Sequence, residues 1–121
     1  MKILVVDDSA TMRKIEIKIL AQLGYTEIIE AEDGVQALEK MSEGPNLILL
    51  DWNMPNMDGL TFVQKVRGQG VKTPIIMVTT EAERSRVIQA IQAGINNYVV
   101  KPFTPPALSK TIATTLAKAA A

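Results

Sequence analysis

The chain has 121 residues, a formal net charge of zero and 47% apolar residues, which suits one compact domain with a hydrophobic core. It contains no cysteine, which excludes a disulfide framework and thiolate metal sites. It also lacks histidine, so any metal site must use oxygen ligands, which favours Mg²⁺ or Ca²⁺ over Zn²⁺. No apolar run approaches the ~20 residues of a membrane span. We therefore expect a soluble cytoplasmic protein that binds no membrane.

The charges are unevenly distributed along the chain. Every Asp and Glu lies at or before Glu83, and the charged residues that follow it are all basic. One interpretation is that these are ordinary solvated helix faces, and the other is that they form a surface for an acidic partner. The basic residues are too scattered to indicate nucleic-acid binding.

The first half of the chain predicts three strands separated by two helices. The apolar run Ile3–Val6 predicts a strand, and Ile28–Ile29 and Leu47–Leu50 predict two more. Asp33 is a suitable N-cap for the helix between the second and third strands. One face of the first helix is predicted from apolar side chains at helical spacing: Met12, Ile15, Ile19 and Leu23.

The second half continues the alternation of strands and helices. Asp58 is a suitable N-cap for a third helix, and Ile75–Val78 predicts a fourth strand. A fourth helix, a fifth strand at Tyr98–Val100 and a fifth helix capped by Thr104 complete the pattern. The prediction is an α/β fold of five βα units, with a parallel sheet covered by helices on both faces.

Polar side chains leave the carboxyl ends of four predicted strands. Ligands of open parallel sheets bind at that edge of the sheet. The residues are Asp7 and Asp8 after the first strand, Asp51 after the third, Thr79 and Thr80 after the fourth, and Lys101 after the fifth. Any one of them is explained by a turn at a strand end, but together they predict a site.

The residue types at this edge suit phosphoryl chemistry. Carboxylates held close together repel one another, and Mg²⁺ relieves the repulsion while binding water and a phosphate oxygen. With Mg²⁺ and a lysine nearby, one carboxylate is free to attack phosphorus and form an acyl phosphate. Lys101 and the hydroxyl of Thr79 are suitable for holding the phosphoryl oxygens.

Four segments resemble the receiver domain of response regulators: VVDDSATMRK, LLDWNMPNMDGL, VTTEA and AGINNYVVKPF. Within that family the chain is most similar to the chemotaxis regulators. The resemblance covers essentially all of residues 1–121 and implies a single receiver domain without an output domain. It also implies a doubly wound, flavodoxin-like sheet in the strand order 2-1-3-4-5, which hydrophobic periodicity cannot provide.

The resemblance implies how the phosphorylation site is built. Asp51 is the expected phosphoacceptor. Asp8, Asp51 and the backbone carbonyl of Asn53 are the expected Mg²⁺ ligands, and Asp7 is expected to hold metal-bound water. Lys101 is expected to pair with the phosphoryl group, and its peptide bond to the following proline to be cis.

The resemblance also implies switch and lifetime residues. Thr79 is expected to hydrogen-bond the phosphoryl group, and Tyr98 to turn inward behind it. Asn53 and Glu81 are expected to influence how water or a phosphatase reaches the acyl phosphate. Trp52, the single tryptophan, adjoins the phosphoacceptor and is therefore expected to report on it by fluorescence.

The implied function is a stand-alone response regulator that receives phosphate from a histidine kinase in chemotaxis or flagellar motor control. The expected output face is the fourth helix, fifth strand and fifth helix, with Val87, Ile91, Ile95 and Tyr98 as candidate contacts. Ile88 and Ile95 also have the spacing of core residues. A flagellar switch protein and a phosphatase are further expected partners of a monomer. The alternative role is a phosphate sink or relay shuttle without a motor target.

Two enzyme or carrier classes share part of this pattern. A haloacid-dehalogenase-like phosphohydrolase also forms an aspartyl phosphate, but it needs a second Asp where this chain has Asn53. A flavodoxin-like electron carrier needs hydroxyls and glycine after the first strand, whereas Asp7 and Asp8 repel a phosphate that lacks a metal. We therefore expect a switch that catalyses only its own phosphorylation and dephosphorylation, not an enzyme acting on other substrates.

Overall fold

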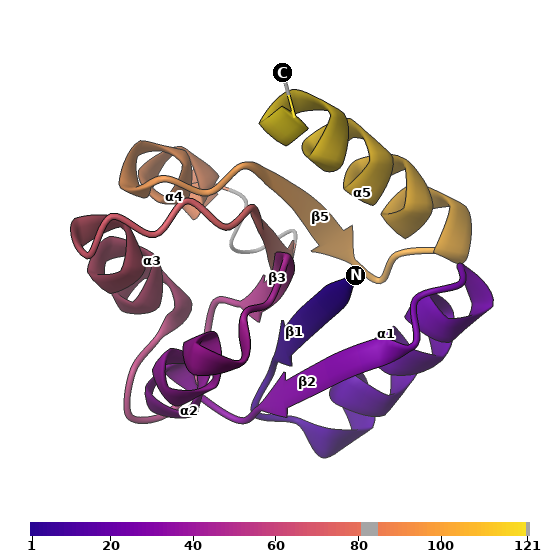
Figure 1. The fold of residues 1–121 in the computed structure, drawn as a ribbon, viewed down its shortest axis with the longest axis horizontal. Helices are drawn as coiled ribbons and strands as arrows, with labels where there is room; N and C mark the ends of the chain where they lie inside the picture. The colour runs from indigo at the N-terminus through magenta and orange to yellow at the C-terminus, as the bar shows by residue number, and fades with distance from the viewer. Residues whose placement is uncertain (81–84, 121) are drawn as a thin grey trace.

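The computed structural model describes residues 1–80 and 85–120, and it gives these residues five strands and five α-helices in alternation (Figure 1). The strands are β1 (Lys2–Val6), β2 (Glu27–Ala31), β3 (Leu47–Asp51), β4 (Ile75–Thr80) and β5 (Asn97–Lys101). The helices are α1 (Ala10–Gln22), α2 (Gly34–Lys40), α3 (Gly59–Gly68), α4 (Val87–Ala93) and α5 (Pro105–Ala120), with a short 3₁₀ turn, η1 (Met41–Glu43), after α2. Among the helices described, none has the length and apolar character needed to cross a membrane.

The strands form one parallel sheet in the order β2-β1-β3-β4-β5, as predicted. The long-range pairing places β1 directly beside β3, with Val6 opposite Leu50. On the other side of β3, Asp51 is opposite Val78 of β4. The carboxyl ends of these central strands therefore lie next to one another at one edge of the sheet.

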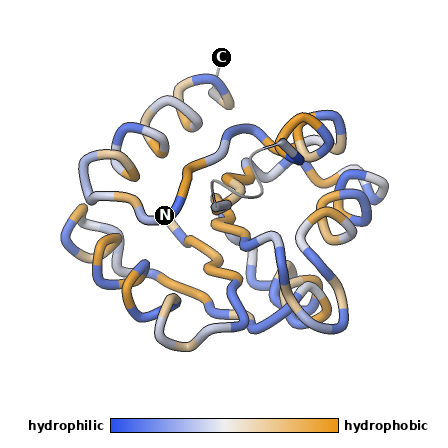
Figure 2. Tube along the Cα trace, turned by 180° about the vertical axis from the view of Figure 1, so that it is seen from behind, coloured by the Kyte–Doolittle hydropathy of each residue, from blue (hydrophilic) through white to orange (hydrophobic). Residues whose placement is uncertain are grey.

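Helices cover both faces of the sheet, so the core has two halves (Figure 1). Alternate strand residues point to opposite faces. Ile3, Val5, Leu49 and Val99 belong to the half that packs beneath α1 and α5, and Leu4, Val6, Leu50 and Met77 to the half beneath α2, α3 and α4. Figure 2 shows hydrophobic residues concentrated along the central strands and hydrophilic ones towards the periphery.

The predicted helix caps at Asp33 and Asp58 are confirmed. The carboxylate of Asp33 accepts a hydrogen bond from the backbone N–H of Gln36 at 2.8 Å. Asp58 accepts one from the backbone N–H of Thr61 at the same distance, 2.8 Å. Each bond satisfies a donor that the first turn of a helix otherwise leaves open, so these residues fix where α2 and α3 begin.

The predicted buried face of α1 is wrong at Ile15, which is 46% exposed. Glu16 is buried instead, together with Ile19 and Leu20. The reason is helical geometry: position 16 lies three residues before Ile19 and four before Leu20, and side chains at these spacings share a face. Because Ile19 and Leu20 both pack against the sheet, α1 turns Glu16 inwards.

The predicted roles of the α4 residues also need correction. Val87 and Ile95, predicted as output contacts, are buried, and for Ile95 this confirms the core spacing that was also noted. Ile88, which shared that core spacing, is 67% exposed. Val87 lies on the buried side of α4 because it is one turn before the fully buried Ala90. Ile95 follows the end of α4 and packs into the core from the loop. Only Ile91, 53% exposed, keeps the exposure that was expected of an output contact on this helix.

Candidate functional site

Three acidic side chains meet at the carboxyl edge of the sheet. Asp7 and Asp8 follow β1, and Asp51 is the last residue of β3. One carboxylate oxygen from each of the three lies within 4.8 Å of the others. The backbone N–H of Asp7 donates to the carbonyl of Ala31 at 3.1 Å, which holds this segment beside the end of β2. The pairing of β1 with β3 is what brings the carboxylates together.

Lys101 extends its ammonium group into the same cluster. It ends β5, and its Nζ lies 3.3 Å from Oδ1 of Asp51 and 3.9 Å from Oδ2 of Asp7. Two positions before Asp7, Asp51 and Lys101, each strand has a core residue of the half beneath α1 and α5. The side chains of all three residues therefore point to the face of the sheet that α1 and α5 cover. The peptide bond from Lys101 to Pro102 is cis, as expected.

Burial and like charges change the ionisation of the cluster. Burial, reinforced by the charge of Asp7, raises the pKa of Asp51 to about 6. Burial likewise raises the pKa of Asp7. Burial alone lowers the pKa of Lys101, but the charges of Asp51 and Asp7 outweigh it, so the net pKa is raised. Ionising both Asp7 and Asp51 is therefore unfavourable, even with the ammonium group of Lys101 beside them.

The donor set fits a hard divalent cation. The three converging groups all offer oxygen, and Oδ2 of Asp7 is buried and accepts no hydrogen bond from the described residues. A depression of about 500 Å³ opens beside the cluster, and it is lined by Asp8, Asn53, Met54, Pro55 and Asp58. Asp8 is exposed and lines this depression, so a hydrated ion can enter there and bind the carboxylates.

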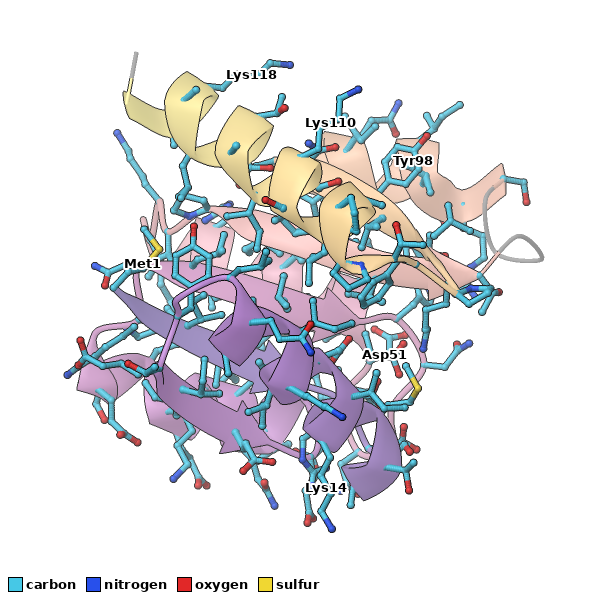
Figure 3. The ribbon with its side chains drawn as sticks, turned by 90° about the vertical axis from the view of Figure 1, so that its right-hand side faces the viewer. Met1, Lys14, Asp51, Tyr98, Lys110 and Lys118 are labelled. Carbon is cyan, nitrogen blue, oxygen red and sulfur yellow. The ribbon has the colours of Figure 1, made fainter. Side chains whose placement is uncertain are left out.

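The remaining site candidates differ in their burial and packing. Thr79 is fully buried, and its hydroxyl donates to the carbonyl of Thr80 at 3.4 Å. Tyr98 is half-buried on the edge strand β5 and packs against the core half of α2, α3 and α4; Figure 3 shows it well away from Asp51. Glu81 lies outside the described residues.

Two charged residues near the site were missed by the sequence analysis. Glu16 of α1 is 1% exposed, and burial raises its pKa to about 8. Arg86, just before α4, has its guanidinium carbon 4.3 Å from the ring centroid of the fully buried Trp52. Glu16 had a usable signal, an acid at helical spacing from Ile19. Arg86 had none, because its contact joins distant segments.

Comparison with known proteins gives the family. The model of the response regulator receiver domain matches residues 3–113, nearly the whole chain. The chain belongs to the response regulator receiver family. This confirms the family expected from the four sequence segments, and the regulators that contain such receivers belong to two-component systems. CheY-like members of the family are regulatory switches rather than enzymes acting on other substrates.

Relatives of this receiver include chemotaxis proteins. The chemotaxis protein CheY1 of Helicobacter pylori is 51% identical over 114 residues, which span 91% of this receiver and 92% of that protein. The CheY homolog of Campylobacter jejuni is 50% identical over 114 residues, 91% of this receiver and 88% of that protein.

Solved structures agree with the fold of the receiver. The chemotaxis response regulator CheY4 of Vibrio cholerae matches with a TM-score of 0.84 and 38% identity, over 94% of this chain and 97% of that one. The receiver domain of NtrX from Brucella abortus matches with a TM-score of 0.87 and 28% identity, over 95% of this chain and 98% of that one. The receiver is thus CheY-like in both sequence and fold.

Proposed function

We propose that this receiver is a chemotaxis response regulator that accepts a phosphoryl group from a histidine kinase onto Asp51. The observation that carries the proposal is the 3.3 Å contact between Lys101 Nζ and Asp51 Oδ1, inside a cluster of three carboxylates. An ammonium group in contact with the acceptor is well suited to neutralise an arriving phosphoryl group. The similarity to CheY1 and the CheY homolog supports the role in chemotaxis.

In the proposed transfer, a carboxylate oxygen of Asp51 attacks phosphorus, a new P–O bond forms, and the P–N bond to the kinase histidine breaks. The departing imidazole takes up a proton. Asp8, Asp51 and the backbone carbonyl of Asn53 would hold Mg²⁺, and Asp7 would bind its water. The bound ion would supply positive charge that lets the acids and the phosphate share the site. Lys101 pairs with a phosphoryl oxygen, and Asp51 reacts in its ionised form, which dominates above a pKa of about 6.

The acyl phosphate is then lost when water attacks phosphorus and Asp51 leaves as a carboxylate. Asn53 is exposed beside the acceptor and lines the open depression through which water arrives. We propose that it shapes this access, together with Glu81. The same opening suits the approach of a phosphatase.

The proposed output face comprises α4, β5 and α5. Ile88 and Ile91 lie one turn apart on α4 and are both exposed, which provides an apolar contact surface. Lys110 and Lys118 project from the outer side of α5 (Figure 3). This combination fits an acidic segment with apolar anchors, and a phosphoryl-dependent movement of Thr79 and Tyr98 would alter the surface. A purely sink or shuttle role would leave the affinity of this face unchanged by phosphorylation.

Fluorescence of Trp52 tests the phosphorylation step. Adding Mg²⁺ should change the emission of Trp52, and adding acetyl phosphate afterwards should change it again. Mass spectrometry should then find one added phosphoryl group. Asp51→Asn should lose the acetyl phosphate response completely, because an amide is not a nucleophile for phosphorus. The matched control is Asp33→Asn, which alters another buried acid while keeping its capping ability. A wild-type protein that gains no phosphoryl group from acetyl phosphate or a histidine kinase would contradict the proposal.

A further inference from the structure

Arg13 is a buried cation that the proposed transfer does not use. It belongs to the buried side of α1 and is 9% exposed. Its neighbour Lys14 is exposed and points away from Asp51 into solvent (Figure 3). Burying a guanidinium group is unfavourable unless hydrogen bonds and opposite charges compensate for the lost water. Arg13 has both, and they connect it to the acidic edge of the sheet.

The guanidinium group of Arg13 holds the main chain of Asp7. Its Nη1 atom donates to the carbonyl oxygen of Asp7 at 2.6 Å, and this hydrogen bond is buried. Hydrogen bonds from a charged donor are among the strongest in proteins. Two exposed acids balance the charge: Nε donates to Oε1 of Glu30 at 3.0 Å, and Nη2 lies 3.9 Å from Oε1 of Glu32. Arg13 therefore acts on Asp7 through a directed hydrogen bond rather than as an unpaired charge.

Hydrogen bonds hold Asp7 at its N–H, its carbonyl and one carboxylate oxygen. The N–H donates to the carbonyl of Ala31 at 3.1 Å, and Oδ1 accepts from the N–H of Ser9 at 2.9 Å. Arg13 holds the carbonyl. The remaining oxygen, Oδ2, accepts no hydrogen bond within residues 1–80 and 85–120, and it lies 3.9 Å from Nζ of Lys101. The hydrogen bonds therefore direct this oxygen into the acidic cluster.

The hydrogen bond from Arg13 also fixes the peptide unit that leads to Asp8. Because a peptide unit is planar, an anchored carbonyl of Asp7 sets the direction in which the chain continues to Asp8. On the other side of Asp8, the carbonyl of Ser9 accepts from the backbone N–H of Arg13 at 3.0 Å. Arg13 thus contacts the turn both before and after Asp8, through its side chain and through its backbone.

We propose that Arg13 is a positioning residue for the Mg²⁺ site, because its hydrogen bond to the carbonyl of Asp7 holds the carboxylates of Asp7 and Asp8 in place. This inference rests on the Mg²⁺ site of the proposed function. The acceptor Asp51 is held separately: it ends β3, and its Oδ1 accepts from the N–H of Trp52 at 2.9 Å. Loss of the guanidinium group should therefore weaken Mg²⁺ binding and leave the acceptor reactive once the ion is bound.

The first test observes the hydrogen bond by NMR in the presence of EDTA, without metal or phosphodonor. In Arg13→Met, the carbonyl ¹³C resonance of Asp7 and the amide ¹⁵N resonance of Asp8 should move, because both nuclei belong to the peptide unit that accepts the bond. The matched control is Lys14→Met, which removes one positive charge from an exposed position of the same helix and should leave both resonances in place. If Arg13→Met moves neither resonance, the proposal is overturned.

The second test titrates Mg²⁺ without a phosphodonor and follows Trp52 fluorescence. Arg13→Met should need about tenfold more Mg²⁺ for half-saturation, as is usual when a residue that holds a metal ligand is removed. Arg13→Lys keeps the charge but lacks the planar donor fork, so it should recover only part of the affinity. Glu30→Gln weakens the link from α1 to β2 but keeps the bond to Asp7, so it should bind Mg²⁺ like the wild type. Equal losses in Arg13→Met and Glu30→Gln would mean that only the packing of α1 matters, which overturns the proposal.

Phosphorylation by acetyl phosphate separates the two proposals. In Arg13→Met, the Mg²⁺ concentration for the half-maximal rate should rise, while the rate at saturating Mg²⁺ should stay close to that of the wild type. A lower saturating rate with an unchanged Mg²⁺ dependence would show that Arg13 acts on the acceptor instead, and the inference fails. A wild type that binds Mg²⁺ but gains no phosphoryl group contradicts the proposed function, and the Mg²⁺ titrations of the variants still decide the role of Arg13.

Discussion

Asp33 and Glu16 occupy two regions of the molecule that treat a buried acid in opposite ways. Asp33, 6% exposed, belongs to a capped turn before α2, where it accepts hydrogen bonds from the backbone N–H of Gln36 and, at 2.7 Å, from the amide of Asn56. These bonds hold its pKa below the ordinary value. Glu16, behind the acidic site, has a buried oxygen without a partner, and burial raises its pKa to about 8.

The difference shows that burial and hydrogen bonds shift the pKa of an acid in opposite directions: burial dominates at Glu16, and hydrogen bonds dominate at Asp33. The capped turn satisfies its carboxylate locally and gains stability from it. The acidic site leaves oxygens of Asp7 and Glu16 without hydrogen bonds, so its charge must be balanced from outside by a cation. Unbalanced charge of this kind is typical of binding sites, and it is unfavourable for folding in the absence of a ligand.

The largest stability effect is expected for Glu16→Gln. Glu16 has a higher pKa in the folded chain than its ordinary value of 4.5, so the folded state binds more protons between pH 4.5 and about 8. The wild type should therefore lose stability as pH rises through that range. At pH 9 and without Mg²⁺, the substitution should raise the free energy of unfolding by on the order of 3 kcal/mol.

Urea unfolding at pH 5, 7 and 9 measures this effect. The difference between Glu16→Gln and wild type should be smallest at pH 5, where both side chains are neutral in the folded state. Asp51 and Asp7 also have raised pKa values, so the variant should retain part of the pH dependence. If the free energy of unfolding changed equally with pH in the two proteins, ionised Glu16 would not destabilise the fold. The contrast between Glu16 and Asp33 would then be wrong.

Mg²⁺ should stabilise the acidic site and leave the capped turn unaffected. At 100 times its dissociation constant, a ligand of the folded state adds about 2.7 kcal/mol to the free energy of unfolding. Thermal unfolding with Mg²⁺ and with excess EDTA measures the shift. Asp8→Asn should reduce it, because one oxygen ligand loses its charge, whereas Asp33→Asn should preserve it. A shift of equal size in both variants would argue against a cation at the cluster.

Removing the cap should have a smaller effect with the opposite pH dependence. Asp33→Ala loses the bonds to Gln36 and Asn56, which should lower the free energy of unfolding by about 1 kcal/mol at neutral pH. Because the pKa of Asp33 is lowered by folding, its contribution is present above the ordinary value of 3.8 and is lost as pH falls. Urea unfolding at pH 3 and 7 tests this, with Asp33→Asn as the variant that keeps a cap.

The smallest effect is expected for Arg86→Ala. The guanidinium stacks on Trp52 next to the acceptor, and contacts of this kind contribute about 0.5–1 kcal/mol at exposed positions. The substitution should change the emission of Trp52 while barely altering stability. Arg86→Lys, which keeps the charge but loses the planar group, is the matched control. An unaltered emission spectrum in both variants would show that the stacking does not persist in solution.

Much of the fold and the site was predictable because its signals are local. Apolar runs marked the strands, and Asp33 and Asp58 marked the first turns of two helices, since a cap depends only on its nearest neighbours. The position of Asp51 at a strand end followed from the chain alone. The strand order came from family resemblance, because pairing joins segments that no local pattern connects.

Tertiary packing decided the features that local patterns left open. The rotation of α1 that buries Glu16 and exposes Ile15 follows from the joint packing of Ile19 and Leu20 against the sheet. The burial of Val87 similarly follows from how α4 lies on its neighbours. The sequence by itself determined which residues could carry charge to the edge of the sheet. Only the pairing of β1 with β3 and the docking of α1 decided which of those charges act on one another, because electrostatic interactions depend on distance in space rather than along the chain.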